Sequence, residues 1–302
     1  MHVVAAGATG FLGRPLVQAL LDAGHEVTIL TRRSRPEWSV RQVEWQPDGE
    51  AGSWRSVVDG ADAVINLAGE SLASGRWTTK RKQVLVDSRM RPTRSLAAAI
   101  AAAARPPRIL VSGSGTNYYG PHGDEVVTEA DSPGTDFLAR LASDWEREAM
   151  AARSPSTRVI VLRTGPALER GGGALGPMLL PFRLGLGGPL GSGRQYWSWI
   201  HREDWVRLVL FLLKHPSADG PFNATAPGPV TNAEFTRELA RVLRRPAIFR
   251  APAFALRLAM GEMADAMVLT GARVIPDRAL KLGFEFRYPT LRPALEAIFR
   301  QS

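Results

Sequence analysis

The stretch Gly7-Ala8-Thr9-Gly10-Phe11-Leu12-Gly13 decides the fold of this chain. It follows the apolar run His2-Val3-Val4-Ala5-Ala6, which predicts a buried strand, and it opens an apolar-periodic segment that predicts a helix ending at Gly24. A second predicted strand, Glu26 to Leu30, follows where a βαβ unit requires it. This order favours a dinucleotide-binding turn over an ordinary strand–helix turn.

Each glycine of the turn suits the binding of a pyrophosphate. Gly7 permits the tight turn, Gly10 lets the backbone approach the pyrophosphate, and Gly13 lets the helix pack closely against the strand. The unpaired N–H groups at the start of the helix attract the anion. We therefore expect a dinucleotide cofactor at this end of the chain.

The residues after the second strand select the cofactor. An NAD-preferring site carries an acidic side chain there, which binds the ribose 2′-hydroxyl. This chain has Thr31-Arg32-Arg33 and no carboxylate before Glu37. A guanidinium pairs with a 2′-phosphate, although two arginines after a strand also suit a solvated surface. Their position favours NADP(H).

The composition of the 302 residues limits the other possibilities. With 45% hydrophobic residues the chain can bury a sizeable core. It has no cysteine, which excludes disulfides and thiolate chemistry and suits a cytoplasmic protein, and its five histidines show no metal-ligand spacing. No apolar run approaches the roughly 20 residues that span a bilayer, so we expect no membrane partner.

The net charge of +9 does not indicate a nucleic-acid partner. All but four of the 38 basic residues are arginines, and they are scattered. Short clusters such as Lys80-Arg81-Lys82 lack the interleaved aromatic residues of single-strand binders. We expect a small-molecule substrate and no nucleic acid.

Further strands and helices alternate along the first half of the chain. The predicted helices run from about Thr79 to Ala104, where Pro106-Pro107 stops the helix, and from about Thr135 to Ala152. This alternation predicts an α/β fold with a Rossmann-like, doubly wound parallel sheet. The remaining predicted strands are Val40 to Trp45, Ala63 to Asn66, Arg108 to Ser112 and Val159 to Leu162.

After Arg163 the pattern changes, because glycine and proline crowd the chain. We expect residues 1–169 to form the NADP-binding domain, with 201–229 returning to it through Phe222 to Thr225. Residues 170–200 and 230–302 would form a smaller C-terminal substrate lobe. Within it, Phe254 to Leu269 is apolar at helical spacing and predicts a packed cap helix rather than a membrane or partner face.

These motifs have a counterpart in a known family. The chain resembles the extended short-chain dehydrogenase/reductase superfamily and, more closely, its atypical branch of NAD(P)-dependent epimerase-like proteins, which have no assigned substrate. The resemblance covers essentially the whole chain. Its motifs are Gly7 to Gly13, Thr31-Arg32-Arg33, Asn66 to Glu70, Asp87-Ser88-Arg89, Tyr118-Tyr119-Gly120, Gly171 to Ala174, Leu179 to Gly188, Gly191-Ser192-Gly193, Ser198 to His201 and Thr231 to Phe235.

The resemblance implies a set of cofactor contacts spread over the Rossmann-like part of the chain. The cofactor would be NADP(H), bound by the glycine turn, the arginines after the second strand, a small-residue strand end, one arginine of the long helix and one alanine after the sixth strand. The residues are Gly7, Thr9, Gly10, Phe11, Leu12, Gly13, Thr31, Arg32, Arg33, Leu67, Ala68, Gly69, Arg89 and Ala167.

The expected catalytic residues are only partly present. Active superfamily members use a serine and a tyrosine–lysine pair one helical turn apart. Ser114 is the best match for the serine, with Ser112 in reserve, but Phe137 to Leu141 contains neither tyrosine nor lysine. Tyr118 or Tyr119 is the candidate substitute; alternatively, both tyrosines only pack in a tight turn.

The expected substrate pocket also departs from the family pattern. Sugar-nucleotide epimerases carry an arginine two residues after a glutamine, aimed at the diphosphate, whereas Gln195 is followed by Tyr196 and Trp197. Phe182, Trp197 and Trp199 would instead make an apolar pocket. His201 and Asp204 match a segment that braces the second lobe.

Two functions fit these observations. The first is an NADP(H)-dependent oxidoreductase or epimerase acting on a small, fairly apolar substrate. The alternative is a catalytically silent NADPH-binding sensor or regulatory protein that kept the cofactor site. The two long helices suit a homodimer interface, although nothing in the sequence requires one.

Overall fold

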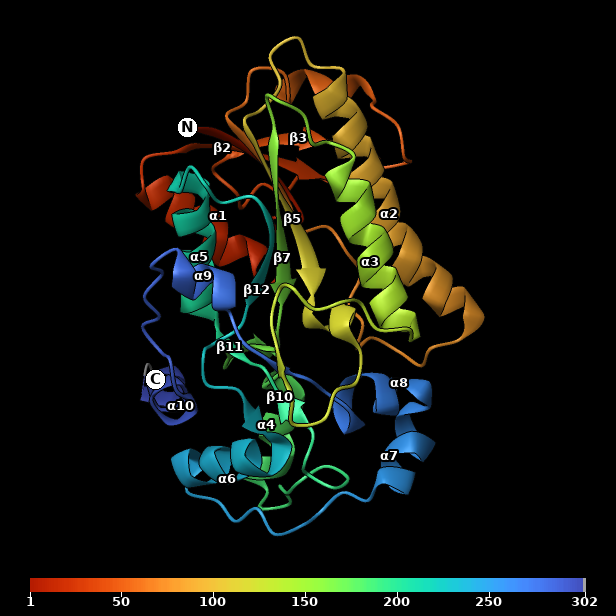
Figure 1. The fold of residues 1–302 in the computed structure, drawn as a ribbon, viewed down its shortest axis with the longest axis vertical. Coiled ribbons are helices and arrows are strands. Elements are labelled where there is room, and N and C mark those ends of the chain that lie inside the picture. The colour runs from red at the N-terminus through yellow and green to blue at the C-terminus, as the bar shows by residue number, and fades with distance from the viewer. Residues whose placement is uncertain (301–302) are drawn as a thin grey trace.

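A seven-stranded parallel sheet forms the centre of the computed structural model, which describes residues 1–300 (Figure 1). The strand order is β12-β7-β5-β4-β1-β2-β3, and every neighbouring pair is parallel. The predicted α/β, Rossmann-like doubly wound fold is therefore confirmed. The strands are β1 (His2–Ala6), β2 (Glu26–Thr31), β3 (Arg41–Glu44), β4 (Ala63–Asn66), β5 (Ile109–Gly115), β7 (Arg158–Thr164) and β12 (Gly220–Ala224).

Helices cover both faces of this sheet (Figure 1). The inner strands β1, β4 and β7 are buried on both sides, so their sequences are continuous apolar runs rather than alternating ones, whereas the edge strand β3 is partly exposed. One apolar core joins the sheet to α1 (Gly13–Asp22) and α5 (Arg202–Lys214). A second core, on the other face, joins it to α2 (Thr79–Ala101) and α3 (Phe137–Met150).

The topology places a crevice above the carboxyl ends of the strands. Strand β1 pairs with β2 on one side and with β4 on the other, so the direction of winding reverses at β1. In open α/β sheets this switch point is where nucleotides bind. The turn from β1 into α1 carries the glycine motif and lies there.

Small elements outside the main sheet lie mostly at the carboxyl ends of its strands (Figure 1). The helices are α4 (Gly176–Arg183), α6 (Asn232–Leu243), α7 (Ala253–Met260), α8 (Glu262–Ala264), a π-helical turn (Asp265–Leu269), α9 (Asp277–Lys281) and α10 (Leu291–Arg300). The short strands are β6 (Val126–Val127), β8 (Ala167–Glu169), β9 (Gly172–Gly173), β10 (Tyr196–Trp197), β11 (Ile200–His201), β13 (Val230–Thr231) and β14 (Arg273–Val274), and 3-10 turns lie at Ser53–Val57 and Thr116–Tyr119.

The prediction of one packed cap helix over Phe254 to Leu269 is wrong. The segment breaks after α7 at Gly261, whose φ of +63° is a left-handed conformation that favours glycine, and continues as α8 and the π-helical turn. No residue of α7 is buried. The apolar spacing was real, but only part of it faces the protein.

Other elements lie close to their predicted positions. The long helix ends at Ala101, three residues before the expected Ala104, and β5 continues to Gly115, so Ser114 lies inside the strand. Phe222 joins the main sheet in β12, beside β7. No helix within residues 1–300 is both long and apolar enough to cross a membrane, and no group of metal-ligating side chains occurs within them.

Candidate cofactor and substrate site

The glycine turn packs too closely for side chains at two of its positions. Gly7 has φ +74°, and a Cβ there would lie 2.4 Å from the carbonyl carbon of Leu67. A Cβ at Gly13 would lie 2.6 Å from Cα of Ala8. At Gly10 the nearest atom to a Cβ is the Gly7 carbonyl oxygen at 3.3 Å, so the other side of this residue is open. The turn thus presents open backbone to a ligand.

The end of β4 lies against this turn and is held by Asn66. The Asn66 side-chain amide donates to Thr93 Oγ1 at 2.8 Å, and its Oδ1 accepts from the Ala68 N–H at 3.1 Å. These bonds fix Leu67, Ala68 and Gly69 beside Gly7. Small, fixed residues at this strand end suit a flat cofactor lying across it.

Arg89 is a buried cation behind Gly69. Its Nη2 donates to the Glu70 carbonyl oxygen at 3.0 Å, its Nη1 donates to the Leu85 carbonyl oxygen at 3.1 Å, and its guanidinium lies 5.3 Å from the centre of the Trp145 ring. Burial lowers the pKa of Arg89 to about 10, so the side chain stays charged at neutral pH. It supplies positive potential beside the cofactor crevice.

The arginines after β2 point their charge toward solvent. Thr31 Oγ1 donates to the Arg33 carbonyl oxygen at 2.9 Å, which fixes the turn. The Arg32 side chain is 80% exposed and lies 4.0 Å from Glu70 Oε1. No carboxylate occupies the strand end itself, where an NAD-preferring site would have one. These residues fit a nucleotide with a 2′-phosphate.

A buried polar network lies under the crevice, between β5, β7 and α3. Glu146 receives two hydrogen bonds from Arg163, from Nε at 2.9 Å and from Nη2 at 2.8 Å. Ser114 Oγ donates to the same carboxylate at 2.7 Å. Burial would lower the pKa of Arg163, but its hydrogen bonds to Glu146 outweigh that effect and raise the pKa above its usual value.

The same network contains Tyr119. Its hydroxyl donates to Asn223 Oδ1 at 2.7 Å and accepts from Arg163 Nη1 at 2.9 Å. The residue is 1% exposed, and burial raises its pKa to about 12. Tyr118 is half-buried, with the Arg163 guanidinium 3.4 Å from its ring centre. Of the three catalytic candidates, Ser114 and Tyr119 are enclosed, and Tyr118 retains solvent contact.

The sequence interpretation missed Glu146 and Arg163. Both carried a signal: Glu146 follows Trp145 on the apolar face of a helix, and Arg163 ends an apolar strand. Charged residues in such places are usually paired when they are buried.

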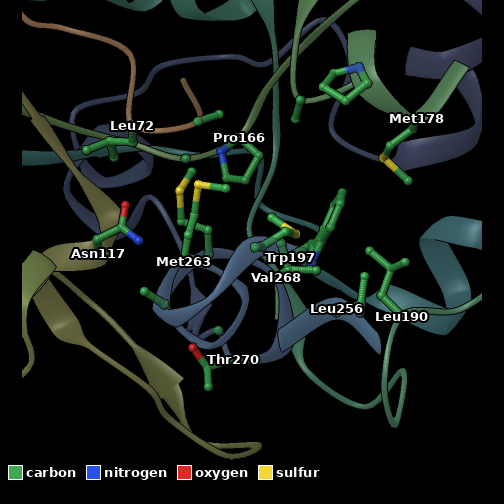
Figure 2. A pocket seen from close by; sticks show the side chains of 18 of the residues that line it. Leu72, Asn117, Pro166, Met178, Leu190, Trp197, Leu256, Met263, Val268 and Thr270 are labelled. Atoms are coloured by element: carbon green, nitrogen blue, oxygen red, sulfur yellow. The ribbon is translucent and has the colours of Figure 1, made fainter. Parts of the chain in front are cut away.

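A cavity of about 810 Å³ lies between the carboxyl ends of β5 and β7 and the small elements within residues 173–274 (Figure 2). Phe11, from the glycine turn, forms part of its wall, as do Asn117 after β5 and Pro166 after β7. In Figure 2, Leu72 and Asn117 lie on one side of the cavity, and Leu190 and Leu256 on the other. The cavity thus continues directly from the candidate cofactor crevice.

The wall of the cavity is mainly apolar. It includes Phe182 and Trp197, as the sequence indicates, and four methionines. Trp199 does not reach this wall: it is fully buried in the core of the small lobe, and its Nε1 donates to the Gly228 carbonyl oxygen at 3.0 Å. The methionines are Met178, Met260, Met263 and Met267.

Few ionisable groups face the cavity. Among the described residues that line it, only Asp136 and Tyr196 ionise, and none is a lysine, arginine or histidine. Asp136 caps α3, accepting from the Ala139 N–H at 3.0 Å through Oδ1. It was missed in the sequence because a capping residue looks the same whether or not it faces a cavity.

His201 and Asp204 brace the small lobe. Asp204 accepts from the backbone N–H groups of Arg287 and Tyr288, both at 2.8 Å. His201 caps α5 by accepting from the Glu203 N–H at 3.1 Å, and its ring centre lies 4.0 Å from that of Tyr288. Burial lowers the pKa of His201. These contacts are structural.

Comparison with known proteins places the chain in a family. The model of the NAD dependent epimerase/dehydratase family matches residues 3–225, and a domain of unknown function (DUF1731) matches residues 251–298. Epimerase family protein ML0860 of Mycobacterium leprae is 42% identical over 293 residues, covering 97% of this chain and 94% of that protein.

Two solved structures are also similar. The human epimerase family protein SDR39U1 (isoform2), solved with NADPH, has a TM-score of 0.91 and 37% identity, covering 100% of both chains. A nucleoside-diphosphate sugar epimerase from Corynebacterium glutamicum has a TM-score of 0.78 and 31% identity, covering 98% of this chain and 57% of that one. With the glycine turn and the parallel sheet already described, these matches show that the chain belongs to the NAD-dependent epimerase/dehydratase family of the short-chain dehydrogenase/reductase superfamily.

Proposed function

We propose that this protein binds NADP(H) and acts as an oxidoreductase or epimerase on a small, uncharged and largely apolar substrate. The observation that carries this proposal is the position of Phe11, which belongs to the glycine turn and also lines the cavity. A cofactor held by the turn would therefore border the space in which a substrate binds. When bound, NADP(H) would accept or supply a hydride there.

The preference for NADP(H) rests on Arg32. Its guanidinium is exposed and directly follows β2, the strand end at which folds of this kind bind the adenosine ribose. The human relative solved with NADPH supports the same choice. Arg89, charged and buried behind Gly69, would add positive potential along the cofactor.

The apolar substrate follows from the cavity wall. A nucleotide sugar carries a diphosphate, and a diphosphate inside a cavity needs cations or many N–H donors around it. Among the described lining residues no cationic side chain is present. Trp197, Phe182 and the four methionines instead offer apolar and polarisable contacts.

Proton transfer is the step for which the chain lacks the usual tyrosine–lysine pair. Tyr118 keeps solvent contact, and its ring centre lies 3.4 Å from the Arg163 guanidinium, so its hydroxyl is the candidate proton carrier that is not enclosed. Asp136 offers a carboxylate on the cavity wall itself. Ser114 and Tyr119 would act indirectly: their hydrogen bonds to Glu146 and Arg163 would hold Arg163 in place against the Tyr118 ring.

A second function, an NADPH-binding sensor without catalysis, is favoured by one specific observation. The hydroxyls of Ser114 and Tyr119 are both engaged in buried hydrogen bonds, so neither is presented to a substrate in this conformation. A sensor needs only the cofactor crevice and a surface that changes when the cofactor binds.

A substrate panel separates these functions. The full chain is mixed with NADPH and a panel of uncharged apolar aldehydes, ketones and quinones, and the loss of absorbance at 340 nm is followed. UDP-glucose is incubated separately with the full chain and NADP+, and both the gain of absorbance at 340 nm and any conversion to another sugar nucleotide, separated by chromatography, are measured. The proposal expects oxidation of NADPH with at least one apolar carbonyl and no conversion of UDP-glucose. Tight NADPH binding without turnover on any compound would support the sensor, and turnover of UDP-glucose alone would refute the apolar site.

A further inference from the structure

Helix α7 is apolar on both of its faces. Its inner face contributes Leu256 and Met260 to the cavity wall. Its outer face carries Phe254 and Leu258, one turn apart, which are 72% and 78% exposed. A helix of this composition normally buries one face, yet none of its eight residues is buried.

Exposed apolar side chains continue from α7 along two neighbouring segments. The chain before α7 pairs with the chain after α4: the Phe249 N–H donates to the Gly187 carbonyl oxygen at 3.1 Å, and the Ala251 N–H donates to the Pro189 carbonyl oxygen at 3.0 Å. In Figure 1, α4 and α7 lie at the same end of the molecule. We define the mouth surface as Leu180, Leu184, Leu186, Ile248, Phe249, Phe254 and Leu258, all exposed.

This surface surrounds an entrance to the cavity. Leu186 and Phe249 line the cavity and are also more than half exposed, so they mark its mouth. Exposed large apolar side chains gathered at the mouth of a cavity are typical of an interaction site. Helix α7 links the two, because Leu256 and Met260 line the cavity while Phe254 and Leu258 are exposed.

The mouth surface is also strongly cationic. The two segments that form it, residues 170–202 and 239–261, contain no aspartate or glutamate. They contain nine arginines, of which three pair with acids outside the segments: Arg202 with Glu169, Arg241 with Glu238 and Arg257 with Asp265. Arg183, Arg245 and Arg250 are exposed, and within residues 1–300 no ion pair to an acid is formed by any of these three. The charge therefore selects an anionic partner.

We propose that the mouth surface docks on an anionic lipid bilayer, from which the apolar substrate enters the cavity. Phe254 and Leu258 would lie at the level of the headgroups while the arginines pair with lipid phosphates. A bilayer fits better than an acidic protein, because a bilayer also dissolves an apolar substrate of the kind that the cavity wall would accept. This proposal reverses the expectation of no membrane partner, which rested on the absence of a spanning segment and on a packed cap helix.

The inference rests on the proposed function for the identity of the substrate, but docking itself is measured without turnover. The full chain is sedimented with vesicles of phosphatidylcholine containing about one third phosphatidylglycerol, and with vesicles of phosphatidylcholine alone. We expect clear binding to the anionic vesicles, weaker binding to the neutral ones, and a loss of binding as salt is raised.

Two double variants test the two components of the surface. Phe254→Ser with Leu258→Ser should weaken vesicle binding about tenfold or more, while Leu280→Ser, an exposed leucine on α9, should not. Arg183→Glu with Arg245→Glu should also weaken vesicle binding about tenfold or more. Its matched control is Arg41→Glu with Arg55→Glu, because both of these arginines lie outside the two acid-free segments. Circular dichroism and the Kd for NADPH should match wild type in all four.

Three outcomes would overturn the proposal. The first is that wild type sediments equally with neutral and anionic vesicles, or with neither. The second is that Phe254→Ser with Leu258→Ser, or Arg183→Glu with Arg245→Glu, binds vesicles as wild type does. The third is a wild-type dimer in sedimentation equilibrium that Phe254→Ser with Leu258→Ser converts to a monomer, which would make the surface an interface between copies. A protein that binds vesicles but not NADPH would refute the proposed function and leave the docking surface standing.

Discussion

Arg163 and Glu146 form a bidentate ion pair inside the protein, with Arg163 Nε 2.9 Å from Oε1 and Nη2 2.8 Å from Oε2 of the carboxylate. Both side chains are buried. The pair joins β7 to α3 directly beneath the crevice, and Ser114 and Tyr119 attach to it from β5 and the turn that follows. The positions of Ser114 and Tyr119, two of the three catalytic candidates, therefore depend on this pair.

Removing one partner of the pair should be costly. Glu146→Gln leaves the Arg163 charge buried with a neutral partner, and we expect the free energy of unfolding to fall by about 3 kcal/mol or more. Glu148→Gln is the matched control, because Glu148 pairs with the exposed Arg94 at the surface and should cost less than about 1 kcal/mol. Urea denaturation measures both; equal effects would contradict a structural role for the buried pair.

Substitutions at two glycines of the turn should have different effects, one on stability and the other on cofactor binding. Gly13→Ala places a Cβ 2.6 Å from Cα of Ala8 and should lower the free energy of unfolding by about 1 to 3 kcal/mol. Gly10→Ala meets only the Gly7 oxygen at 3.3 Å, so the fold should persist while NADPH affinity drops about tenfold or more. Thermal denaturation and calorimetric titration of both variants test this. A Gly10→Ala protein that binds NADPH normally would place the pyrophosphate elsewhere.

Because of His201, the free energy of unfolding should decrease as the pH falls below neutral. Burial lowers its pKa below the usual 6.5, so below that pH the unfolded chain binds more protons than the folded one. The stability it contributes at neutral pH is lost as the pH falls from 6.5 through the folded-state pKa, at most about 1.4 kcal/mol per pH unit.

The variant His201→Asn keeps a helix-capping side chain and removes the titrating ring. Its free energy of unfolding should be lower than wild type at pH 7 because the stacking on Tyr288 is gone, but it should decline less between pH 7 and pH 5. Urea titrations at several pH values give both slopes. Parallel slopes would show that His201 does not titrate differently on folding.

Narrowing the cavity should block apolar ligands without affecting the cofactor. Ala266 lines the cavity, and Ala266→Trp fills part of it. We expect the fluorescence of the uncharged dye Nile red to rise with wild type and to rise far less with this variant, while the Kd for NADPH is unchanged. Ala101→Trp, at the exposed end of α2, is the control. Unchanged dye binding in Ala266→Trp would mean that the dye binds elsewhere.

The main sheet was predictable because its strands are buried on both faces. Val159 to Leu162 and Ala63 to Asn66 are short, mainly apolar runs of the length of one strand. Such runs predict strands that are buried on both faces, and both lie inside the main sheet. The glycine turn was predictable for a different reason. Its backbone conformation and close packing require glycine, so the glycine residues themselves indicate the turn.

The buried polar network, the cavity wall and the exposure of α7 were not predictable, because they depend on contacts between segments that are distant in the sequence. Glu146 and Arg163 are 17 residues apart, and Ser114 reaches Glu146 across 32 residues, so no local pattern records that network. Trp199 and Trp197 are two residues apart in one apolar run, yet one is in the core and the other on the cavity wall. For α7, the sequence shows apolar residues at helical spacing, but it does not show which face of the helix stays exposed to solvent.

Cofactor choice tests the account most directly. Calorimetric titration of the full chain should show tighter binding of NADPH than of NADH, and Arg32→Ala should weaken NADPH about tenfold or more while leaving NADH unchanged. Arg35→Ala, a neighbouring arginine whose backbone rather than side chain makes the local bonds, should behave as wild type. Equal losses for both nucleotides in Arg32→Ala, or no binding of either by wild type, would contradict the account.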